Sequence, residues 1–176
     1  MTRAARDRVL VLMRHAKTEE SNPGGDHERE LTARGRRDAT AAGHWLLEHG
    51  IGIDEVLCST AERTRQTCEA VWESGCPEAE VHHDRRIYNG SPEAVLAALW
   101  ETDEDADVVM VVGHAPGVPA LAELLADGDG SVEGHRALAE GFPTCGLAVL
   151  HYAGRWADIG AGDATLERFH VARADH

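Results

Sequence analysis

The sequence predicts an α/β fold, in which a mainly parallel sheet is covered by helices on both sides and an antiparallel element lies near the C-terminus. Two observations lead to this prediction. Short apolar runs alternate with helical patterns from residue 8 to residue 125, as expected for strand–helix repetition. Residues 146–171 instead contain two segments in which apolar and polar residues alternate, which is typical of half-buried antiparallel strands.

The first four elements are predicted in residues 8–74. Residues 8–13 contain the run VLVLM, which indicates a strand buried on both faces. Thr32 is the expected N-cap of a helix whose apolar residues recur at helical spacing until Gly50 ends it. Residues 55–59 (EVLCS) predict a second short strand, and a helix is expected to follow it from residue 61 to residue 74.

The middle of the chain continues this alternation. Residues 80–84 give a weaker strand pattern, and Ser91 and Pro92 supply an N-cap and a first-turn proline for the helix that follows. Residues 107–112 (DVVMVV) give the strongest strand pattern in the chain, and Pro116 opens a helix after it.

The last third of the chain departs from this pattern. Residues 126–134 are polar and rich in glycine, so we expect a loop there. Residues 146–152 and 165–171 are predicted as two half-buried strands that form a hairpin across residues 153–163.

Length and composition indicate a globular protein. With 176 residues, we expect residues 1–176 to form one domain. Hydrophobic residues make up 43% of the chain, enough for a core. No apolar stretch approaches the roughly 18 residues of a membrane span, and VLVLM is too short for a secretory signal. We therefore expect a cytoplasmic protein without a membrane partner. Its cysteines are expected to be reduced and mostly buried, namely Cys58, Cys68, Cys76 and Cys145.

The charge distribution points to an anionic ligand. The formal net charge of −14 argues against nucleic acid as a partner. Cationic residues are nevertheless concentrated in the first half of the chain, whereas residues 101–140 are mainly acidic, and a role in solubility alone does not explain this asymmetry. A local cationic pocket in an acidic protein suits a small anion or a phosphorylated side chain. The cationic residues are Arg14, Lys17, Arg29, Arg34, Arg36, Arg37, Arg63 and Arg65.

Three of the predicted strands are followed by histidine or arginine. Arg14 and His15 come directly after the first strand, Arg63 follows the second, and His114 follows the strand at residues 107–112. In open α/β sheets, ligands bind outside the carboxyl ends of the strands. We therefore expect two imidazoles and two guanidiniums to lie together at one edge of the sheet.

Phosphoryl transfer is the chemistry that suits such a cluster. Its transition state spreads negative charge over three oxygens, and the planar fork of arginine donates paired hydrogen bonds to phosphate oxygens. A neutral imidazole is a competent nucleophile near neutral pH. We therefore predict that His15 attacks phosphorus. Arg14, Arg63 and a protonated His114 would hold the phosphate oxygens, and the dipole of the helix opened by Pro116 would add positive potential.

Four segments of the chain resemble signature segments of the histidine phosphatase superfamily, also called phosphoglycerate mutase-like. VLVLMRHAKT resembles the RHG-type signature, LTARGRRDA the LTxxGxxQA segment, STAERTRQT the SPxxRAxQT segment and VVMVVGHAPG the block with the second histidine. The four occur in the family's order. The resemblance implies a three-layer α/β/α sandwich, a nucleophile at His15, phosphate-binding residues at Arg14 and Arg63, and the second histidine at His114.

Departures from the family pattern resemble one branch of it, the SixA-type phosphohistidine phosphatases. Ala16 replaces the glycine after the nucleophile, and the segment between Arg65 and Val112 is too short for a large lid over the substrate. Members that act on alkyl phosphate esters usually have an acidic residue in this segment. Arg85 stands at the aligned position, and Asp84, one place away, could serve as the general acid if the register shifts.

A missing acid affects substrates unequally. Losing acid assistance to an alkoxide costs about 10²–10⁴-fold in rate, whereas imidazole, with a reference pKa of about 6.5, leaves more readily. We therefore expect hydrolysis of phosphohistidine on a partner protein, with no cofactor and no metal. The alternatives are a phosphomonoesterase that takes a small phosphorylated substrate and uses Asp84 as its acid, and a phosphate-binding pseudo-enzyme without catalytic activity.

Neighbouring polar residues are given lesser roles. Ser59 and Thr60 are expected to cap a helix rather than to bind a ligand, and Thr18 and Asn22 are candidates for lining the pocket.

Two further groups are weighed against surface roles. Arg34, Arg36 and Arg37 are expected on the exposed face of their helix, with steering of an anionic partner as the alternative. A metal site in the sequence His82-His83-Asp84 is disfavoured, because the two adjacent histidines of a strand point to opposite faces.

Overall fold

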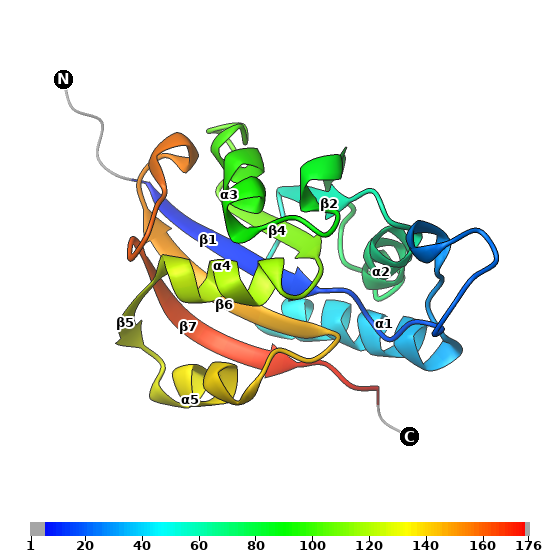
Figure 1. Cartoon of the computed structure of the whole chain (residues 1–176). Helices are drawn as coiled ribbons and strands as arrows, with labels where there is room; N and C mark the ends of the chain where they lie inside the picture. Colours follow the sequence, from blue (N-terminus) through cyan, green and yellow to red (C-terminus); the bar gives the residue numbers. More distant parts are fainter. Residues whose placement is uncertain (1–5, 175–176) are drawn as a thin grey trace.

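The computed structural model describes residues 6–174, which form a seven-stranded sheet with helices on both faces (Figure 1). The strands lie in the order β3-β2-β4-β1-β6-β7-β5. Their bounds are β1 Asp7–Arg14, β2 Glu55–Ser59, β3 Glu80–Asp84, β4 Val108–Gly113, β5 Ala126–Gly130, β6 Gly146–Ala153 and β7 Ala164–Val171. The α-helices are α1 Ala33–Glu48, α2 Glu62–Trp72, α3 Pro92–Trp100, α4 Gly117–Leu125 and α5 Val132–Glu140. Three short 3₁₀ helices complete the described elements: η1 Asp26–Glu28, η2 Arg85–Ile87 and η3 Trp156–Asp158.

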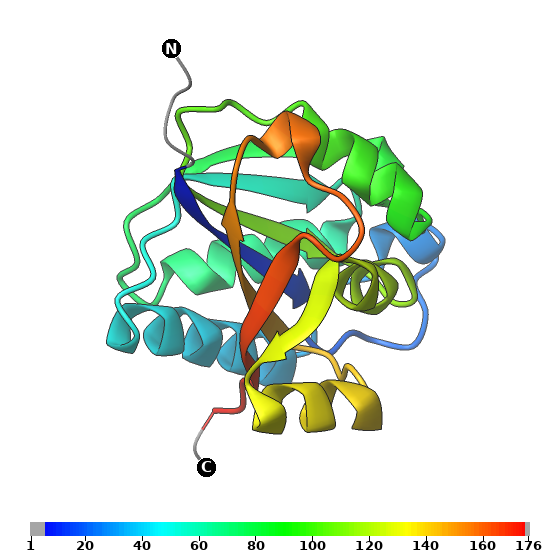
Figure 2. The ribbon, with the colours of Figure 1, turned by 90° about the vertical axis from the view of Figure 1, so that its left-hand side faces the viewer.

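The sheet is mainly parallel, as predicted. Strands β3, β2, β4 and β1 are mutually parallel, and β5 is parallel to β7. Only β6 among the described strands runs against both of its neighbours, β1 and β7. The turned view in Figure 2 shows the twist of the sheet between its two helical layers. The carboxyl ends of β1, β2 and β4 consequently lie together at one edge, with Arg14 opposite Gly113 and Cys58 opposite Val112.

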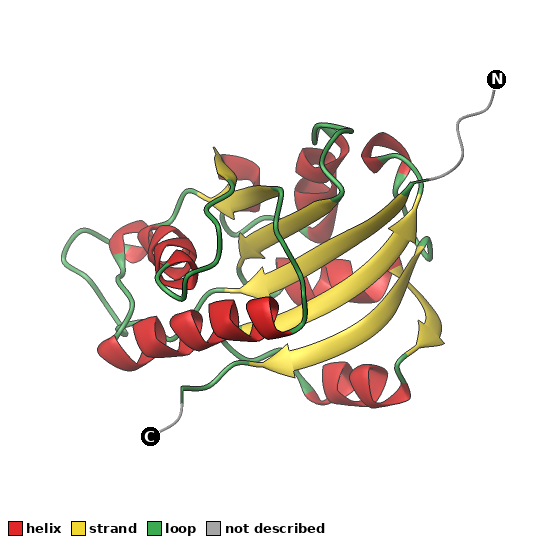
Figure 3. Cartoon of the chain, turned by 180° about the vertical axis from the view of Figure 1, so that it is seen from behind, coloured by secondary structure: helices red, strands yellow, loops and turns green. Residues whose placement is uncertain are grey.

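Alternating residues of the central strands bind the layers together. Leu10 and Leu12 of β1 belong to the apolar cluster shared with α3 and α4, whereas Val11 and Met13 belong to the cluster shared with α1 and α2. Figure 3 shows α1 lying across the back of the sheet. All four β1 residues are fully buried, which explains why the strand is continuously apolar. The molecule is thus a three-layer α/β/α sandwich.

Local signals set the helix starts. The Thr32 hydroxyl accepts a hydrogen bond from the Gly35 N–H at 3.0 Å, and the Ser91 hydroxyl accepts one from Ala94 N–H at 3.2 Å. Both caps satisfy donors that the first helical turn leaves unpaired. The strands predicted at residues 55–59 and 80–84 are confirmed with the same bounds.

The loop predicted for residues 126–134 is wrong. Ala126–Gly130 forms edge strand β5, and α5 begins at Val132. The pairing with β7 brings Asp127 Oδ2 within 2.6 Å of the Thr165 hydroxyl. A Cβ added at Gly130, where φ is +97°, would lie 2.1 Å from the Leu166 carbonyl oxygen. Gly130 therefore permits a close backbone approach, and the long-range pairing overrides the local turn signal.

The second correction concerns β6, which was predicted to be half-buried. Residues 146–150 are all buried, because β6 lies between two neighbouring strands with apolar clusters on both faces. Its antiparallel pairing with β7 is confirmed. The four cysteines, all within the described range, are free thiols at buried positions, as expected. Within residues 6–174, no helix has the length and apolar character needed to cross a bilayer.

Candidate active site

A cavity of about 340 Å³ opens at the carboxyl edge of the parallel strands. It holds all four residues that the sequence predicted to meet there, together with several that it did not. The lining residues are Arg14, His15, Thr18, Asp26, Arg29, Arg63, Asn89, His114, Ala115 and Thr144. The rings of His15 and His114 are 5.3 Å apart between centroids.

His15 is held at the end of β1 by backbone contacts. Its N–H donates to the Gly113 carbonyl at 3.0 Å, and its side chain is 7% exposed. Ring atom Nδ1 is 2.7 Å from the Ala16 carbonyl oxygen. Because a carbonyl oxygen only accepts, Nδ1 carries the proton, and Nε2 retains its lone pair.

The environment of His15 keeps its ring neutral. Burial, followed by the positive charges of Arg63 and Arg14, lowers the pKa of His15 to about 4. A neutral imidazole with a free nitrogen is the form that can act as a nucleophile near neutral pH.

His114 is buried beside Ser59. Its Nε2 atom is 2.7 Å from the Ser59 hydroxyl, which also accepts the Ala61 N–H at 3.3 Å. Ser59 thus contacts the second histidine, a role beyond the helix cap that its sequence position indicated. This arrangement lets the Ser59 hydroxyl donate to Nε2, and the neutral ring then carries its proton on Nδ1.

The protonation predicted for His114 needs correction. Burial and the neighbouring charge of Arg63 lower the pKa of His114 to about 3. Without a bound anion the ring is therefore neutral at pH 7, because an imidazolium in this cationic, buried surrounding is unfavourable. It can still offer a hydrogen-bond donor to an oxyanion.

Three buried nitrogens of the cavity residues lack a hydrogen-bond partner. They are Arg14 Nε, Arg63 Nε and His114 Nδ1. Arg14 Nη1, by contrast, donates to the Phe142 carbonyl at 2.9 Å. Buried donors are normally paired, so an unpaired set around one cavity fits a ligand with several acceptor oxygens.

Asp26 is the main residue that sequence reasoning missed. It lies in η1, and its Oδ2 atom accepts hydrogen bonds from Arg63 Nη2 at 3.2 Å and from the Tyr88 hydroxyl at 2.6 Å. Its Oδ1 atom accepts from Arg29 Nη1 at 3.0 Å, and its backbone carbonyl accepts from Arg63 Nη1 at 2.8 Å. These contacts, led by Tyr88 and Arg29, hold the pKa of Asp26 well below its usual range. The carboxylate therefore fixes the guanidinium of Arg63 and stays ionised.

The remaining cavity residues had weak or no sequence signals. Arg29 also donates to the Thr18 hydroxyl at 2.7 Å, so Thr18 lines the cavity as anticipated. Asn22 does not line it, because its side chain bonds to Glu19 and the Gly24 N–H. Asn89 follows the 3₁₀ helix η2, and Thr144 precedes β6. No sequence motif marks either residue. The DxxR spacing before the LT segment is the one pattern that could have indicated Asp26 and Arg29.

Asp84, the alternative general acid, lies outside this cavity. Its Oδ2 atom accepts from Arg86 Nη2 at 2.7 Å, and this contact lowers its pKa. Asp84 lines a different cavity, together with Glu55 and His82. Arg85, at the position aligned with the family acid, is exposed. Neither residue contacts the histidine pair.

Gly35 explains the glycine of the LTARG segment. A Cβ at this position would lie 2.1 Å from the Lys17 carbonyl oxygen. Glycine therefore lets the first turn of α1 pack directly against the loop that follows His15.

One group of described residues has the composition of a metal site. His82 Nε2 is 3.9 Å from Glu55 Oε2 and 3.7 Å from Glu80 Oε1, on the β2–β3 edge. The group lies outside the histidine cavity, and acidic side chains predominate in it.

Comparisons with known proteins agree with the sequence motifs. Residues 10–89 match the family model described as the histidine phosphatase superfamily, branch 1. An uncharacterized protein of Mycobacterium tuberculosis (strain ATCC 25618 / H37Rv) is 40% identical over 163 residues, which cover 92% of this chain and 100% of that protein.

Two solved structures share both fold and sequence. One, from Nakamurella multipartitia, is described as a candidate phosphohistidine phosphatase SixA; it is 39% identical with a TM-score of 0.84, over 97% of this chain and 99% of that one. A second candidate SixA, from Agrobacterium tumefaciens, is 30% identical with a TM-score of 0.77, over 93% of this chain and 97% of that one.

Proposed function

We propose that this chain, which belongs to the histidine phosphatase superfamily, is a phosphatase that forms a phosphohistidine intermediate on His15 and acts on phosphohistidine of a partner protein. The observation that carries the proposal is the arrangement around His15. A neutral imidazole with a free Nε2 lies beside three unpaired buried nitrogens of Arg14, Arg63 and His114.

Each of the four residues has a defined part in the proposed reaction. His15 Nε2 attacks phosphorus in line, so that a P–N bond to His15 forms while the P–N bond to the substrate imidazole breaks. The substrate imidazole takes a proton from water on its other ring nitrogen before the P–N bond breaks, so that it keeps the bonding electron pair and leaves as a neutral ring. Arg14, Arg63 and the Nδ1–H of His114 donate to the three oxygens on which charge accumulates. Water then attacks phosphorus, the P–N bond to His15 breaks, and inorganic phosphate leaves.

The acidic residues near the cavity favour this leaving group. Asp26 is ionised by its contacts with Tyr88, Arg29 and Arg63, so it has no proton to give to an alkoxide. Asp84 is bonded to Arg86 outside the cavity. Imidazole needs less acid assistance than an alcohol, and the structural neighbours bear the name of enzymes that act on phosphohistidine.

A substrate panel tests the proposal. Wild-type protein and the His15→Ala variant are assayed on a histidine-phosphorylated protein, a sugar phosphate and an aryl phosphate. We expect the wild type to have a kcat/KM at least tenfold higher on the phosphohistidine protein. The His15→Ala variant should keep less than about 1% of turnover, because covalent catalysis supplies most of the acceleration.

Three other outcomes would each point elsewhere. Faster hydrolysis of the sugar phosphate, together with sensitivity to Asp84→Asn, would identify a small-molecule phosphomonoesterase. Tight binding of vanadate without any turnover would identify a pseudo-enzyme. Turnover without phosphate trapped on His15 after brief exposure to radiolabelled substrate would exclude the covalent intermediate.

A further inference from the structure

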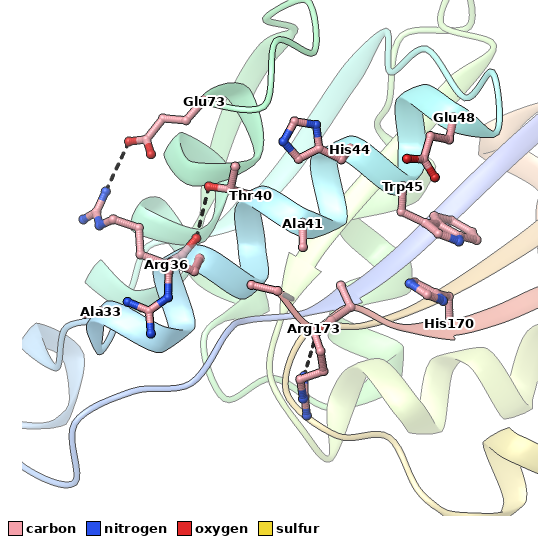
Figure 4. Close-up of a pocket in the computed structure, with 13 residues that line it drawn as sticks. Ala33, Arg36, Thr40, Ala41, His44, Trp45, Glu48, Glu73, His170 and Arg173 are labelled. Carbon is pink, nitrogen blue, oxygen red and sulfur yellow. Dashed lines mark hydrogen bonds and ion pairs between the residues drawn. The ribbon is translucent and has the colours of Figure 1, made fainter. Parts of the chain in front are cut away.

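A second cavity, of about 740 Å³, lies between α1 and the residues that follow β7 (Figure 4). We call it the α1 groove; the lining residues that matter here are Arg36, Arg37, His44, Trp45, His170 and Arg173. One hydrogen bond connects a residue that lines the α1 groove with a residue that lines the His15 cavity. Arg173 Nη1 donates to the Thr144 carbonyl at 2.9 Å, and Thr144 lines the His15 cavity. A chain segment leaving the His15 cavity past Thr144 would therefore enter the α1 groove.

Three arginines and two glutamates, Glu48 and Glu73, line this groove, so cations outnumber anions there although the protein as a whole is strongly acidic. Arg36 and Arg37 lie near the N-terminus of α1, whose first turn contains no acidic residue. Cations at this end oppose the helix dipole, at a cost of about 0.3–1 kcal/mol each. The stability of the helix therefore does not explain their presence.

The two arginines of α1 are largely free to meet a partner. Arg37 is exposed and forms no ion pair with any residue in the range 6–174. Arg36 meets Glu73 at 3.5 Å, with both side chains about half exposed, and a pair of this kind contributes little. Arg173, across the groove, is fixed by the carbonyls of Thr144 and Ala172, and its guanidinium also lies 3.9 Å from the Asp38 carboxylate.

The other end of the groove is aromatic. Trp45 and His170 stack with ring centroids 4.6 Å apart and planes 5° from parallel. Figure 4 shows these two rings at one end, with Glu48 above them, and Arg36 at the opposite end. The groove thus offers cations near the His15 cavity and a flat ring pair farther along.

We propose that the α1 groove docks an acidic segment of the phosphorylated partner protein, next to its phosphohistidine. This inference rests on the proposed function, because it concerns a protein substrate of the same active site. Charge complementarity supports an acidic occupant. The overall charge of −14 repels an acidic protein, and the arginines of the α1 groove offset this repulsion locally. Continuity with the His15 cavity through Thr144 supports a segment of the substrate rather than an unrelated ligand.

Charge reversal in the groove tests the docking role. Arg37→Glu and the double variant Arg36→Glu/Arg37→Glu are assayed on an acidic histidine-phosphorylated protein and on an aryl phosphate. We expect kcat/KM on the protein to fall about tenfold at low ionic strength and about twofold at 0.5 M salt, because salt screens exposed charges. On the aryl phosphate the change should stay below about twofold, because the small substrate does not reach the groove.

Arg155→Glu provides the matched control. Arg155 is an exposed arginine beyond the end of β6, and the neighbouring Gly154 bonds to Arg6 at the start of β1, at the sheet edge opposite to His15. This variant has the same change in net charge and should behave as wild type on both substrates. An equal loss for Arg155→Glu and Arg37→Glu would overturn the proposal, as would equal loss on both substrates in the groove variants.

A binding measurement separates docking from turnover. Calorimetry with the His15→Ala protein and the same phosphorylated protein should give an affinity that falls about tenfold on adding Arg37→Glu. If the wild type hydrolyses no phosphohistidine, the proposed function is wrong, but the calorimetric measurement still tests whether the phosphorylated protein docks in the groove. Unchanged affinity would refute docking. A shift in oligomeric state by sedimentation, with unchanged affinity, would instead show the groove to be a contact between copies of the chain.

Discussion

The two halves of the sheet serve the cavity in different ways. The parallel half, β3-β2-β4-β1, delivers charged and titratable side chains from its carboxyl ends, including His15 after β1 and His114 after β4. The other half, β6, β7 and β5, supplies mainly backbone groups. Because β6 is antiparallel, its start lies where β1 ends, and the Cys145 N–H bonds to the carbonyls of Arg14 and His15 at 3.2 and 3.1 Å.

The difference shows that the fold takes the charged and titratable side chains of the site from one half of the sheet and the backbone groups that hold them in place from the other half. Parallel strands bring several loops to one edge, so side chains from distant parts of the sequence converge there. The segment that leads into the antiparallel strand contributes neutral carbonyl and amide groups, such as the Phe142 carbonyl that accepts a hydrogen bond from Arg14. These groups orient the cations without adding charge to the site.

Removing a cation from the parallel half should have the largest effect. We expect Arg63→Ala to lower kcat/KM by about 10²–10³-fold, because one oxyanion donor is worth that much. The control is Arg65→Ala, two residues later, whose exposed guanidinium bonds to the Thr60 carbonyl at 3.2 Å outside the cavity. Steady-state kinetics should show little change for this control, and similar losses in both variants would contradict the assigned role.

The two buried neutral histidines of the parallel half should make the free energy of unfolding fall in acid. A ring whose pKa is lowered on folding stabilises the protein above its unfolded pKa of about 6.5 and loses that contribution as the pH falls toward the folded pKa. With folded pKa values of about 4 for His15 and about 3 for His114, each ring should reduce the free energy of unfolding by about 2 kcal/mol between pH 7.5 and pH 5. Denaturant unfolding at both pH values measures this.

Substitution of these rings gives the control. The loss of stability between pH 7.5 and pH 5 should be smaller in His15→Gln and His114→Gln than in the wild type, because glutamine does not titrate. An equal pH dependence in all three proteins would mean that neither buried ring is held neutral.

Releasing Arg63 from its anchor should have a moderate effect. Asp26→Asn removes the charge that fixes Arg63 and Arg29, and we expect kcat/KM to fall about tenfold, equivalent to about 1.4 kcal/mol or one net hydrogen bond. Glu28→Gln, in the same 3₁₀ helix but outside the cavity, is the matched control. A variant with unchanged kcat/KM would show that Arg63 is held well enough by the Asp26 backbone carbonyl alone.

Disturbing the edge of the other half should have the smallest effect. Thr165→Val removes the hydroxyl that donates to Asp127 and should cost about 0.5–1 kcal/mol of stability, with unchanged kcat/KM at neutral pH. A double-mutant cycle with Asp127→Ala isolates the pair. A loss of activity in either variant would contradict the assignment of the active-site side chains to the parallel half alone.

The parallel half is also the part that the sequence predicts well. Its central strands β1 and β4 contain continuous apolar runs, and a polar residue follows each run, as with Arg14 after VLVLM. These are local signals, so the strand bounds and the meeting of the four expected site residues could both be anticipated.

The missed features depend on contacts between distant residues. Strand β5 is polar and exposed, and its pairing with β7 has no counterpart in its own periodicity. Asp26 becomes part of the cavity through Tyr88 and Arg63, which lie 62 and 37 residues away. The neutrality of His114 likewise follows from its burial beside Arg63, which strand patterns do not report.

In the proposed reaction, the hydrogen bond from His15 Nδ1 to the Ala16 carbonyl determines which regioisomer of phosphohistidine should form on His15. A proton on that nitrogen, held by a backbone acceptor, leaves the tele position as the single site for phosphorylation. The captured intermediate should accordingly be tele-phosphohistidine, labile to acid and stable to alkali, and the pros isomer should be missing from its alkaline hydrolysate.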